Sequence, residues 1–258
     1  TLFSLGQYEA SKSVFIKLKE LDENSFGAAL GIAWNAVKLS DPGATGYLNA
    51  AKKLGKKTEK PSVYDAFGWL ALNNKDFKAA KKYFKKEENA IINAFGVAYS
   101  PDPKVGEAWL MIKQDNWRKA EKQFKIGLRR DPNCIYCRDG LGRVFLHAGK
   151  LEKALVEAKE GAKLARHNYG LVALVSEILF KIADVQTSID TYRELADVHK
   201  GDELWNIRLS TSLVESGDAK SGKQILLALL ANDRESTAVL GALEVLRFQE
   251  RNAVSEGW

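Results

Sequence analysis

A repeating period of 34 residues is the feature that most restricts how this chain can fold. The three clearest copies are WLALNNKDFKAAKKYF at 69–84, WLMIKQDNWRKAEKQF at 109–124 and RVFLHAGKLEKALVEA at 143–158. Small residues stand at one aligned position of the frame: Ala80, Ala120, Ala154, Ser188 and Gly222. A period of this length is typical of an array of supersecondary units, each of which buries its apolar face against the next.

The residues within each period predict helices. Ala, Leu and Lys recur at helical spacing, only 5 of the 258 residues are proline, and strand-like alternation is hard to find. The chain is 45% hydrophobic and 28% charged, which indicates a folded protein rather than a disordered one. No apolar run reaches the roughly 18 residues that a membrane span needs. We therefore expect an all-α protein that does not span a membrane.

These repeats resemble those of the tetratricopeptide repeat family, in which two helices, here called helix A and helix B, touch through small residues. The small residue of helix A is matched by Ala33, Gly68, Ala108, Gly142, Ser176 and Ser210, and that of helix B by the aligned residues above. The large residue four positions later is matched by Phe15, Phe84, Phe124 and Tyr192, and the turn residue by Gly6, Gly149 and Gly217. The resemblance implies a right-handed α-solenoid of about seven repeats. The first would lack helix A, and a capping helix near 237–251 would end the array.

The period lengthens once, because Ala80 and Ala120 are 40 residues apart. The extra residues fall within 85–107, where an apolar run is followed by Pro101 and Pro103, and proline disfavours helix in the residue before it. One interpretation is a boundary between N-terminal repeats at 1–98 and C-terminal repeats with the cap at 99–258. The alternative is one continuous solenoid with a longer helix and a bend near 85–107.

A partner-binding groove is predicted on the concave face, which helix A lines in solenoids of this class. The residue after the small residue of helix A is expected to point there, and it is Trp34, Trp69, Trp109 and then Arg143. The neighbouring positions expected in the groove are Asn73, Ile112, Lys113 and His147. Tryptophan offers a large apolar area and one N–H donor, so it often anchors interfaces. The alternative is that these tryptophans fill the space between neighbouring helices A.

A second candidate surface is basic. Residues 51–86 contain eleven lysines and three acidic residues, and Lys78, Lys82 and Lys85 share one face of a predicted helix B. We expect this patch to be a solvated outer surface. An acidic protein or an anionic membrane surface is the alternative, and nucleic acid is the least favoured because arginine is sparse and no aromatic residue is clearly displayed for base stacking.

No set of catalytic residues stands out. His147, His167 and His199 form no HxxxH or HExxH pattern, and DGLG at 139–142 follows no strand. Cys134 and Cys137 lack the further ligands of a zinc site and the β-α-β setting of a thioredoxin-like pair. We favour buried packing thiols there, with a disulfide next and a metal or redox role last. We expect no enzyme, no cofactor and no metal.

The leading functional hypothesis is a non-catalytic scaffold that binds a protein or peptide, but no small-molecule substrate, in a bacterial multi-protein assembly. The alternative is the regulatory part of a larger signalling protein or enzyme, because the chain starts inside a repeat. The net charge of +6 hints at acidic partners without identifying one. The sequence leaves the oligomeric state open. It slightly favours the cytoplasm, with export or membrane association as alternatives.

Overall fold

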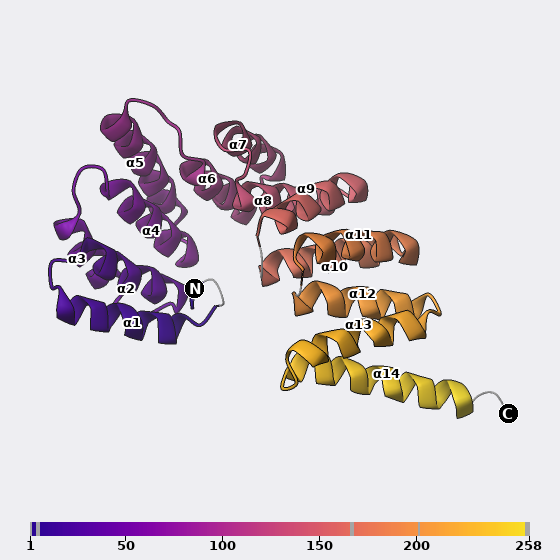
Figure 1. The fold of residues 1–258 in the computed structure, drawn as a ribbon. Coiled ribbons are helices and arrows are strands. Elements are labelled where there is room, and N and C mark those ends of the chain that lie inside the picture. The colour runs from indigo at the N-terminus through magenta and orange to yellow at the C-terminus, as the bar shows by residue number, and fades with distance from the viewer. Residues whose placement is uncertain (1, 4–5, 166–167, 201, 256–258) are drawn as a thin grey trace. The chain divides into compact units, whose positions relative to one another are not determined.

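The structure is a computed structural model that describes residues 2–3, 6–165, 168–200 and 202–255, and this part of the chain contains 14 helices and no strand (Figure 1). The helices are α1 (Tyr8–Leu21), α2 (Phe26–Lys38), α3 (Ala44–Leu54), α4 (Lys60–Asn73), α5 (Phe77–Phe95), α6 (Asp102–Lys113), α7 (Trp117–Arg130), α8 (Ile135–His147), α9 (Leu151–Leu164), α10 (Tyr169–Ile182), α11 (Val185–Val198), α12 (Glu203–Glu215), α13 (Ala219–Asn232) and α14 (Thr237–Ser255). A lone helix B, α1, precedes six A–B pairs, and α14 follows them. The predicted all-α array of helix–turn–helix repeats is confirmed.

The chain divides into two compact units, Thr1–Val144 (unit 1) and Phe145–Trp258 (unit 2), and α8 crosses the division. The expected boundary between 98 and 99 lies within unit 1 and stays a prediction, with one continuous solenoid as its alternative. The extra residues of the long period do lengthen helix B there, since α5 has 19 residues and ends at Phe95. Pro103 lies in the first turn of α6, where its missing N–H costs no helical hydrogen bond.

In unit 1 each helix packs on the next along the chain, and helices A also contact one another, α2 with α4 and α4 with α6. The predicted small residues lie at these crossings: Ala33, Ala80, Ala108 and Ala120 are all 0% exposed. Small side chains let helix axes approach to about 8–10 Å, so the 34-residue frame marks the points of closest contact.

In two repeats of unit 1, the phenylalanine of helix B inserts against glycines of neighbouring helices A. A Cβ atom on Gly68 of α4 or Gly106 of α6 would lie 2.4 or 2.3 Å from the ring of Phe84, and one on Gly140 of α8 would lie 2.1 Å from the ring of Phe124. Both rings are 0% exposed. The repeats therefore depend on a ring-on-glycine contact that the sequence frame did not single out at Gly106 and Gly140.

Every turn between helix A and helix B has a left-handed residue. Glycine fills the turn at Gly6, Gly149 and Gly217, as predicted, and other residues take the same conformation at Ser40, Lys75, Asp115 and Ala183. Glycine adopts positive φ without the steric cost that a Cβ atom imposes. These turns follow the repeat spacing through residues 26–60, where the sequence pattern alone was weak.

In unit 2 the packing uses hydrogen bonds as well as small residues. The hydroxyl of Ser210 in α12 donates to the carbonyl oxygen of Gly222 in α13 (2.9 Å), at the predicted A–B crossing. His199, at the end of α11, is buried, and its Nε2–H donates to the carbonyl oxygen of Ala162 in α9 (2.6 Å). His199 thus has a structural role, because its hydrogen bond joins the end of α11 to α9. His167 lies outside the described residues.

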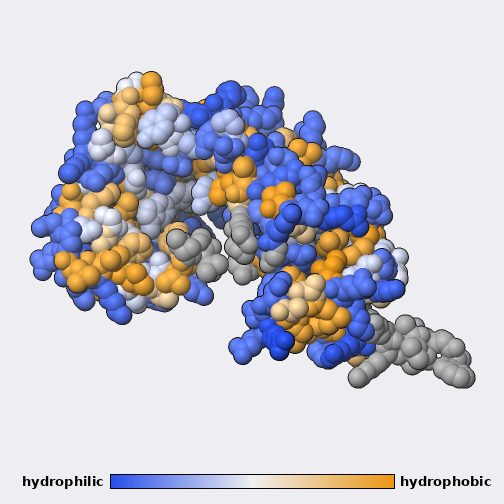
Figure 2. All heavy atoms as spheres, in the orientation of Figure 1, coloured by the Kyte–Doolittle hydropathy of each residue, from blue (hydrophilic) through white to orange (hydrophobic). Residues whose placement is uncertain are grey.

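Hydrophilic side chains cover much of the visible surface, with orange hydrophobic patches between them (Figure 2). One such patch lies over α1, where Val14, Leu18 and Leu21 are 47%, 46% and 86% exposed. No helix among the described residues is both long enough and apolar enough to cross a membrane.

Candidate functional site

A cavity of about 590 Å³ opens within unit 1, along the face that helices A form. Trp34 of α2, Trp69 of α4 and Trp109 of α6 line it, and Tyr136 of α8 adds a fourth ring. The full set of lining residues is Phe3, Phe15, Gly31, Trp34, Asn35, Lys38, Asp65, Trp69, Asp102, Val105, Trp109, Tyr136 and Asp139. The three tryptophans picked out by the repeat frame thus line one cavity.

These tryptophans also pack against the core. Trp69 meets the ring of Phe84 edge-on, with ring centroids 5.9 Å apart, and Trp109 meets Phe124 in the same way at 6.0 Å. Trp34 and Trp69 also contact the apolar cluster around Ala33 and Phe67. Both interpretations of the sequence describe part of the arrangement, because each indole packs between helices and also faces the cavity. Edge-to-face contact leaves much of each ring available to a ligand.

Two buried acceptors lie at the cavity wall without a donor. The side chain of Asn35 in α2 is 0% exposed and donates from Nδ2 to the carbonyl oxygen of Gly31 (2.8 Å). Its Oδ1 has no hydrogen-bond partner among the described residues, and neither has Oδ1 of Asp65 in α4. Buried polar atoms are nearly always paired, so two unpaired acceptors on one cavity indicate donors that arrive from outside.

Asp65 is the most perturbed ionisable group of this cavity. Burial and the nearby charge of Asp102 raise its pKa to about 8, although a hydrogen bond from Trp69 and the charge of Lys38 act in the opposite direction. The residue as a whole is only half-buried, so its carboxyl group borders the cavity while Oδ1 lies just below the wall. At neutral pH the carboxyl group is therefore largely protonated, and a nearby cation would favour its ionised form.

The charges that face the cavity are mainly acidic. The carboxylate of Asp102 accepts from the hydroxyl of Ser100 (2.8 Å), and that of Asp139 accepts from Nε of Arg143 (3.1 Å). Burial raises the pKa of Asp139, and its ion pair with Arg143 counters that effect. Lys38 is the basic residue of the lining, and its Nζ lies 6.0 Å from the ring centroid of Trp69. Burial lowers the pKa of Lys38.

The other predicted groove residues lie away from this wall. Asn73 donates from Nδ2 to the carbonyl oxygen of Val37 (3.4 Å), and Ile112 and Lys113 end α6 beyond the lining. Arg143 reaches the cavity only through Asp139, and His147 is exposed at the end of α8, in unit 2. Their part in binding stays a prediction.

Sequence reasoning missed the polar residues of the cavity, although a signal existed. Asp65 lies four residues before Trp69, and Asp139 four residues before Arg143, so each shares a helical face with a predicted groove residue. Asp102 and Tyr136 are also equivalent in the 34-residue frame. Extending the frame by two turns toward the start of helix A would have found all four.

The basic patch is exposed, as expected for an outer surface. Lys78, Lys82 and Lys85 lie on α5, on the side away from the buried Ala80 and Phe84. Whether a partner binds there stays a prediction.

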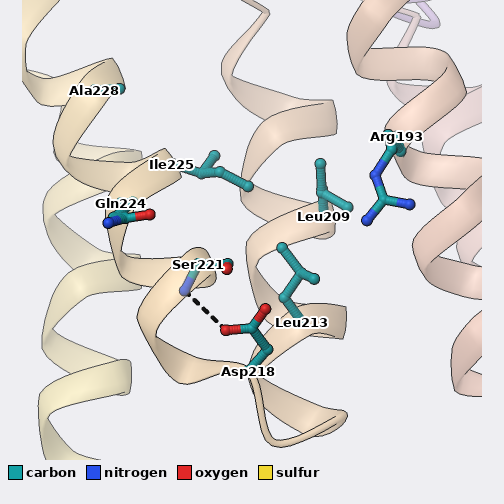
Figure 3. Close-up of a pocket in the computed structure, with 8 residues that line it drawn as sticks. All are labelled: Arg193, Leu209, Leu213, Asp218, Ser221, Gln224, Ile225 and Ala228. Carbon is teal, nitrogen blue, oxygen red and sulfur yellow. Dashed lines mark hydrogen bonds between the residues drawn. The ribbon is translucent and has the colours of Figure 1, made fainter.

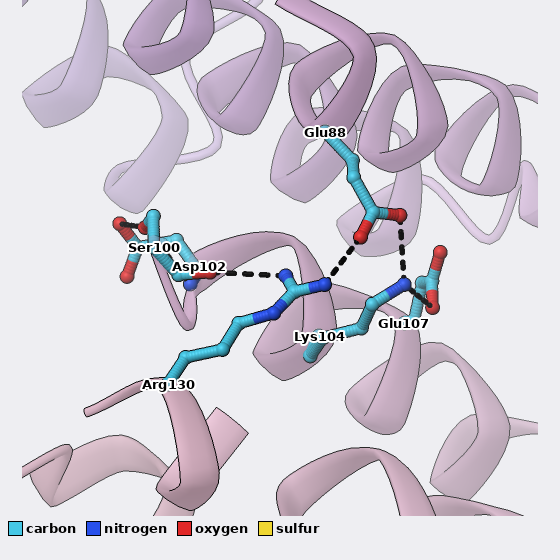
Figure 4. A network of polar contacts seen from close by, with 6 residues as sticks. All are labelled: Glu88, Ser100, Asp102, Lys104, Glu107 and Arg130. Carbon is cyan, nitrogen blue, oxygen red and sulfur yellow. Dashed lines mark hydrogen bonds and ion pairs between the residues drawn. The ribbon is translucent and has the colours of Figure 1, made fainter. Parts of the chain in front are cut away.

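An ion-pair network holds α5, α6 and α7 together where the period is longer (Figure 4). Glu88 of α5 accepts from Lys104 of α6 (2.7 Å) and from Arg130 of α7 (2.6 Å), and Arg130 also donates to the carbonyl oxygen of Ser100 (3.1 Å). Burial acts to raise the pKa of Glu88, but these hydrogen bonds outweigh it and hold the pKa below its ordinary value. The network fixes the start of α6, and with it Asp102 and Trp109 of the cavity.

Unit 2 has a smaller cavity of about 400 Å³ between α12 and α13 (Figure 3). Leu209 and Leu213 of α12 and Ile225 of α13 form an apolar surface, and Arg193 of α11 stands at its edge. Asp218 accepts from the backbone N–H of Ser221 (3.0 Å), which caps the start of α13. The polar atoms of this cavity thus have structural roles.

Cys134 and Cys137 form a disulfide, which corrects our preference for packing thiols. Both residues are buried, and a Cβ atom on Gly127 of α7 would lie 2.5 Å from Sγ of Cys137. The bridge therefore packs in the joint between α7 and α8, and Tyr136 lies between its two cysteines in the sequence. Among the described residues, no group of three or more His, Cys, Asp and Glu side chains is arranged to hold a metal ion.

Comparisons with known proteins agree with the repeat. A sequence model described as Tetratricopeptide repeat matches residues 61–86, which form most of α4 and the first half of α5. Among curated proteins, anaphase-promoting complex subunit 3 of Schizosaccharomyces pombe is 22% identical over 225 residues, 83% of this chain and 31% of that protein. Trafficking protein particle complex subunit 12 is similar over 97 residues, 38% of this chain. The mouse protein is 28% identical with 12% of its length covered, and the human protein 27% with 13%. This chain thus spans about a third or less of these relatives.

Solved structures share the fold at low identity. Yeast Tom70 superposes with a TM-score of 0.59 at 13% identity over 96% of this chain and 60% of Tom70. The Cut9–Hcn1 hetero-tetramer of the APC/C gives 0.57 at 10% identity over 95% of this chain and 47% of the other. The Pseudomonas aeruginosa pilF structure gives 0.53 at 13% identity over 89% of this chain and 98% of the other.

Proposed function

We propose that this chain, whose residues 61–86 match the Tetratricopeptide repeat model, is a non-catalytic scaffold whose unit 1 cavity binds a peptide segment of a partner protein. The observation that carries the proposal is the convergence of Trp34, Trp69 and Trp109 on one cavity. Each belongs to a different repeat, so an extended peptide that follows the helices A would meet one indole after another. Ring-lined cavities with a few polar groups are the usual form of such binding sites.

The relatives support a role in a multi-protein assembly. The curated relatives are named as subunits of a large complex and of a trafficking complex. Because these relatives come from fission yeast, mouse and human, we do not restrict the proposed assembly to bacteria. The same matches cover only part of longer proteins, which also agrees with our alternative that these repeats serve a larger regulatory protein.

The proposal is tested with a phage-displayed library of random peptides selected on the purified chain. Tyr136 is 59% exposed and lines the cavity, so Tyr136→Ala removes binding surface at little cost to the core. Tyr99→Ala is the matched control, because Tyr99 is similarly exposed at 52% in unit 1 but is not part of the lining.

We expect peptides selected on the wild type to bind Tyr136→Ala about tenfold more weakly, a loss of about 1.4 kcal/mol, and to bind Tyr99→Ala as well as wild type. Fluorescence polarisation with the labelled peptides measures both affinities. Equal binding to Tyr136→Ala and wild type would place the peptide site elsewhere and refute the proposal.

A further inference from the structure

The cavity of unit 1 has the chemistry of a site for a cation. Its wall combines aromatic rings with carboxyl groups, and the described lining contains Asp65, Asp102 and Asp139 against one basic residue, Lys38. Arg143 already neutralises Asp139, which leaves Asp65 and Asp102 as the acidic groups open to a ligand. A carboxylate-bearing ligand would meet repulsion here, whereas a positively charged group would be attracted.

The unpaired acceptors can accept hydrogen bonds from a ligand. The hydrogen bond from Nδ2 of Asn35 to the Gly31 carbonyl oxygen fixes the amide orientation, because a carbonyl oxygen can only accept. Oδ1 of Asn35 must then accept, and it has no partner among the described residues. Oδ1 of Asp65 also has no hydrogen-bond partner among the described residues, and the carboxyl group of this half-buried residue can turn toward the cavity.

The aromatic wall can hold a cation at the same place. Nζ of Lys38 already lies 6.0 Å from the ring centroid of Trp69, within the range of a cation–π contact. Trp34 and Trp109 line the same cavity, together with Asn35 and Asp65. A flat or extended cationic side chain that enters between the rings would place its N–H groups toward Asp65.

A buried acidic group lies behind the wall. Glu87 of α5 is only 2% exposed, its Oε2 is unpaired among the described residues, and burial together with the charges of Asp65 and Asp102 raises its pKa well above its ordinary value. Three carboxyl groups from α4, α5 and α6 thus interact with one another, and a ligand cation would favour their ionised forms.

We propose that this cavity recognises the positively charged side chain of an arginine or lysine residue in the bound peptide, through the Asp65 carboxylate and the tryptophan rings, an inference that rests on the proposed peptide-binding function. Asp65 provides the charge-assisted hydrogen bond, and Trp69 and Trp109 hold the side chain by its faces. Asp102 supplies long-range attraction at the start of α6. Peptides that bind here contain a basic residue flanked by apolar ones.

The probes are the amides of arginine, lysine and citrulline, each acetylated at its α-amino group so that its side chain is unchanged. Choline serves as a cation that lacks N–H donors. Citrulline has nearly the shape of arginine but no charge, so it separates charge from shape. Tryptophan fluorescence follows each titration. Asp65→Asn is the test variant, because it removes the charge and keeps the size of the side chain. Asp22→Asn, at an exposed carboxyl group after α1, is the matched control.

We expect wild type to bind the arginine or the lysine amide at least about tenfold more tightly than citrulline amide and choline. Asp65→Asn should lose that preference, while Asp22→Asn keeps it and circular dichroism shows both variants folded. Equal binding of arginine and citrulline amides by wild type, or an unchanged preference in folded Asp65→Asn, would overturn the inference.

The two proposals fail separately. Selected peptides that need Tyr136 but lack basic residues, and that bind Asp65→Asn as well as wild type, would overturn cation recognition and leave the peptide-binding function standing. Binding of arginine amide that needs Asp65, together with peptides that are indifferent to Tyr136→Ala, would instead overturn the peptide-binding function of this cavity.

Discussion

Replacing Asp65 by asparagine should change how the stability of unit 1 depends on pH. In the folded protein, burial and the charge of Asp102 raise the pKa of Asp65 to about 8, from an ordinary value of 3.8. Asparagine has nearly the same shape and resembles the protonated carboxyl group. The variant therefore keeps the interactions of the neutral form and loses only the titration.

The direction in which the free energy of unfolding changes with pH depends on whether the folded or the unfolded state holds the proton. Between about pH 4 and pH 8 the unfolded chain releases the Asp65 proton, whereas the folded protein retains it. The free energy of unfolding thus falls as pH rises through this window, by up to about 1.4 kcal/mol per pH unit from this group, and levels off above the folded pKa.

Over two pH units within the window, the stability of Asp65→Asn relative to wild type should therefore rise by up to about 3 kcal/mol. Lys38 opposes the raised pKa, Glu87 is coupled to it, and the residue keeps some contact with solvent. Each of these reduces the effect, so we expect about 1–3 kcal/mol in favour of the variant.

Urea unfolding at a series of pH values measures the difference. Unit 1 contains Trp34, Trp69, Trp109 and Trp117, so tryptophan fluorescence reports mainly on this unit. Asp22→Asn serves as the control and should give a curve parallel to wild type. If the pH dependence of Asp65→Asn also runs parallel to wild type between about pH 5.5 and 7.5, Asp65 is not held in its protonated form and the reasoning is wrong.

Two further predictions concern the supports of the cavity. Gly106→Ala should destabilise unit 1 by about 1–3 kcal/mol, because the new Cβ atom would lie 2.3 Å from the buried ring of Phe84. Gly27→Ala, in α2 with nothing within 4 Å of the new Cβ atom, should stabilise the unit by up to about 1 kcal/mol. Urea unfolding compares the two variants, and equal effects would contradict the ring-on-glycine contact. Glu88→Gln should lower the free energy of unfolding by about 1.5–3 kcal/mol, because the mostly buried Lys104 and Arg130 lose their shared counter-charge. Glu121→Gln breaks a more exposed pair with Lys125 and should lower it by less than about 1 kcal/mol. A smaller loss of stability for Glu88→Gln than for Glu121→Gln would count against the network.

The sequence predicted the repeats because their signal is local and recurs. Ala80, Ala120 and Ala154 stand at fixed spacing and are fully buried, since two helices can approach closely only where the side chains are small. The same frame placed Trp34, Trp69 and Trp109 on the face of helix A, and they line one cavity. A periodic packing rule therefore revealed both the fold and the apolar part of the site.

Where the period is irregular, the sequence predicted less of the structure. The lengthened repeat favoured a boundary near 98 and a longer helix about equally. The ion pairs at this place join Glu88, Lys104 and Arg130, which come from three different helices. Ion pairs between helices leave no periodic trace. The sequence also did not predict the left-handed turns at Lys75 and Asp115, because these residue types, unlike glycine, are not typical of positive φ.

The helical repeat, the contacts between helices A and B and the row of tryptophans could be predicted from the sequence, because each depends on spacing along a helix. The unpaired Oδ1 atoms of Asn35 and Asp65, and the charge of Asp102 that raises the pKa of Asp65, became visible only in the folded protein. Burial and electrostatic interaction depend on distances between residues of different helices. For that reason the sequence pointed to the aromatic part of the cavity, and the structure added its unpaired acceptors and its acidic groups.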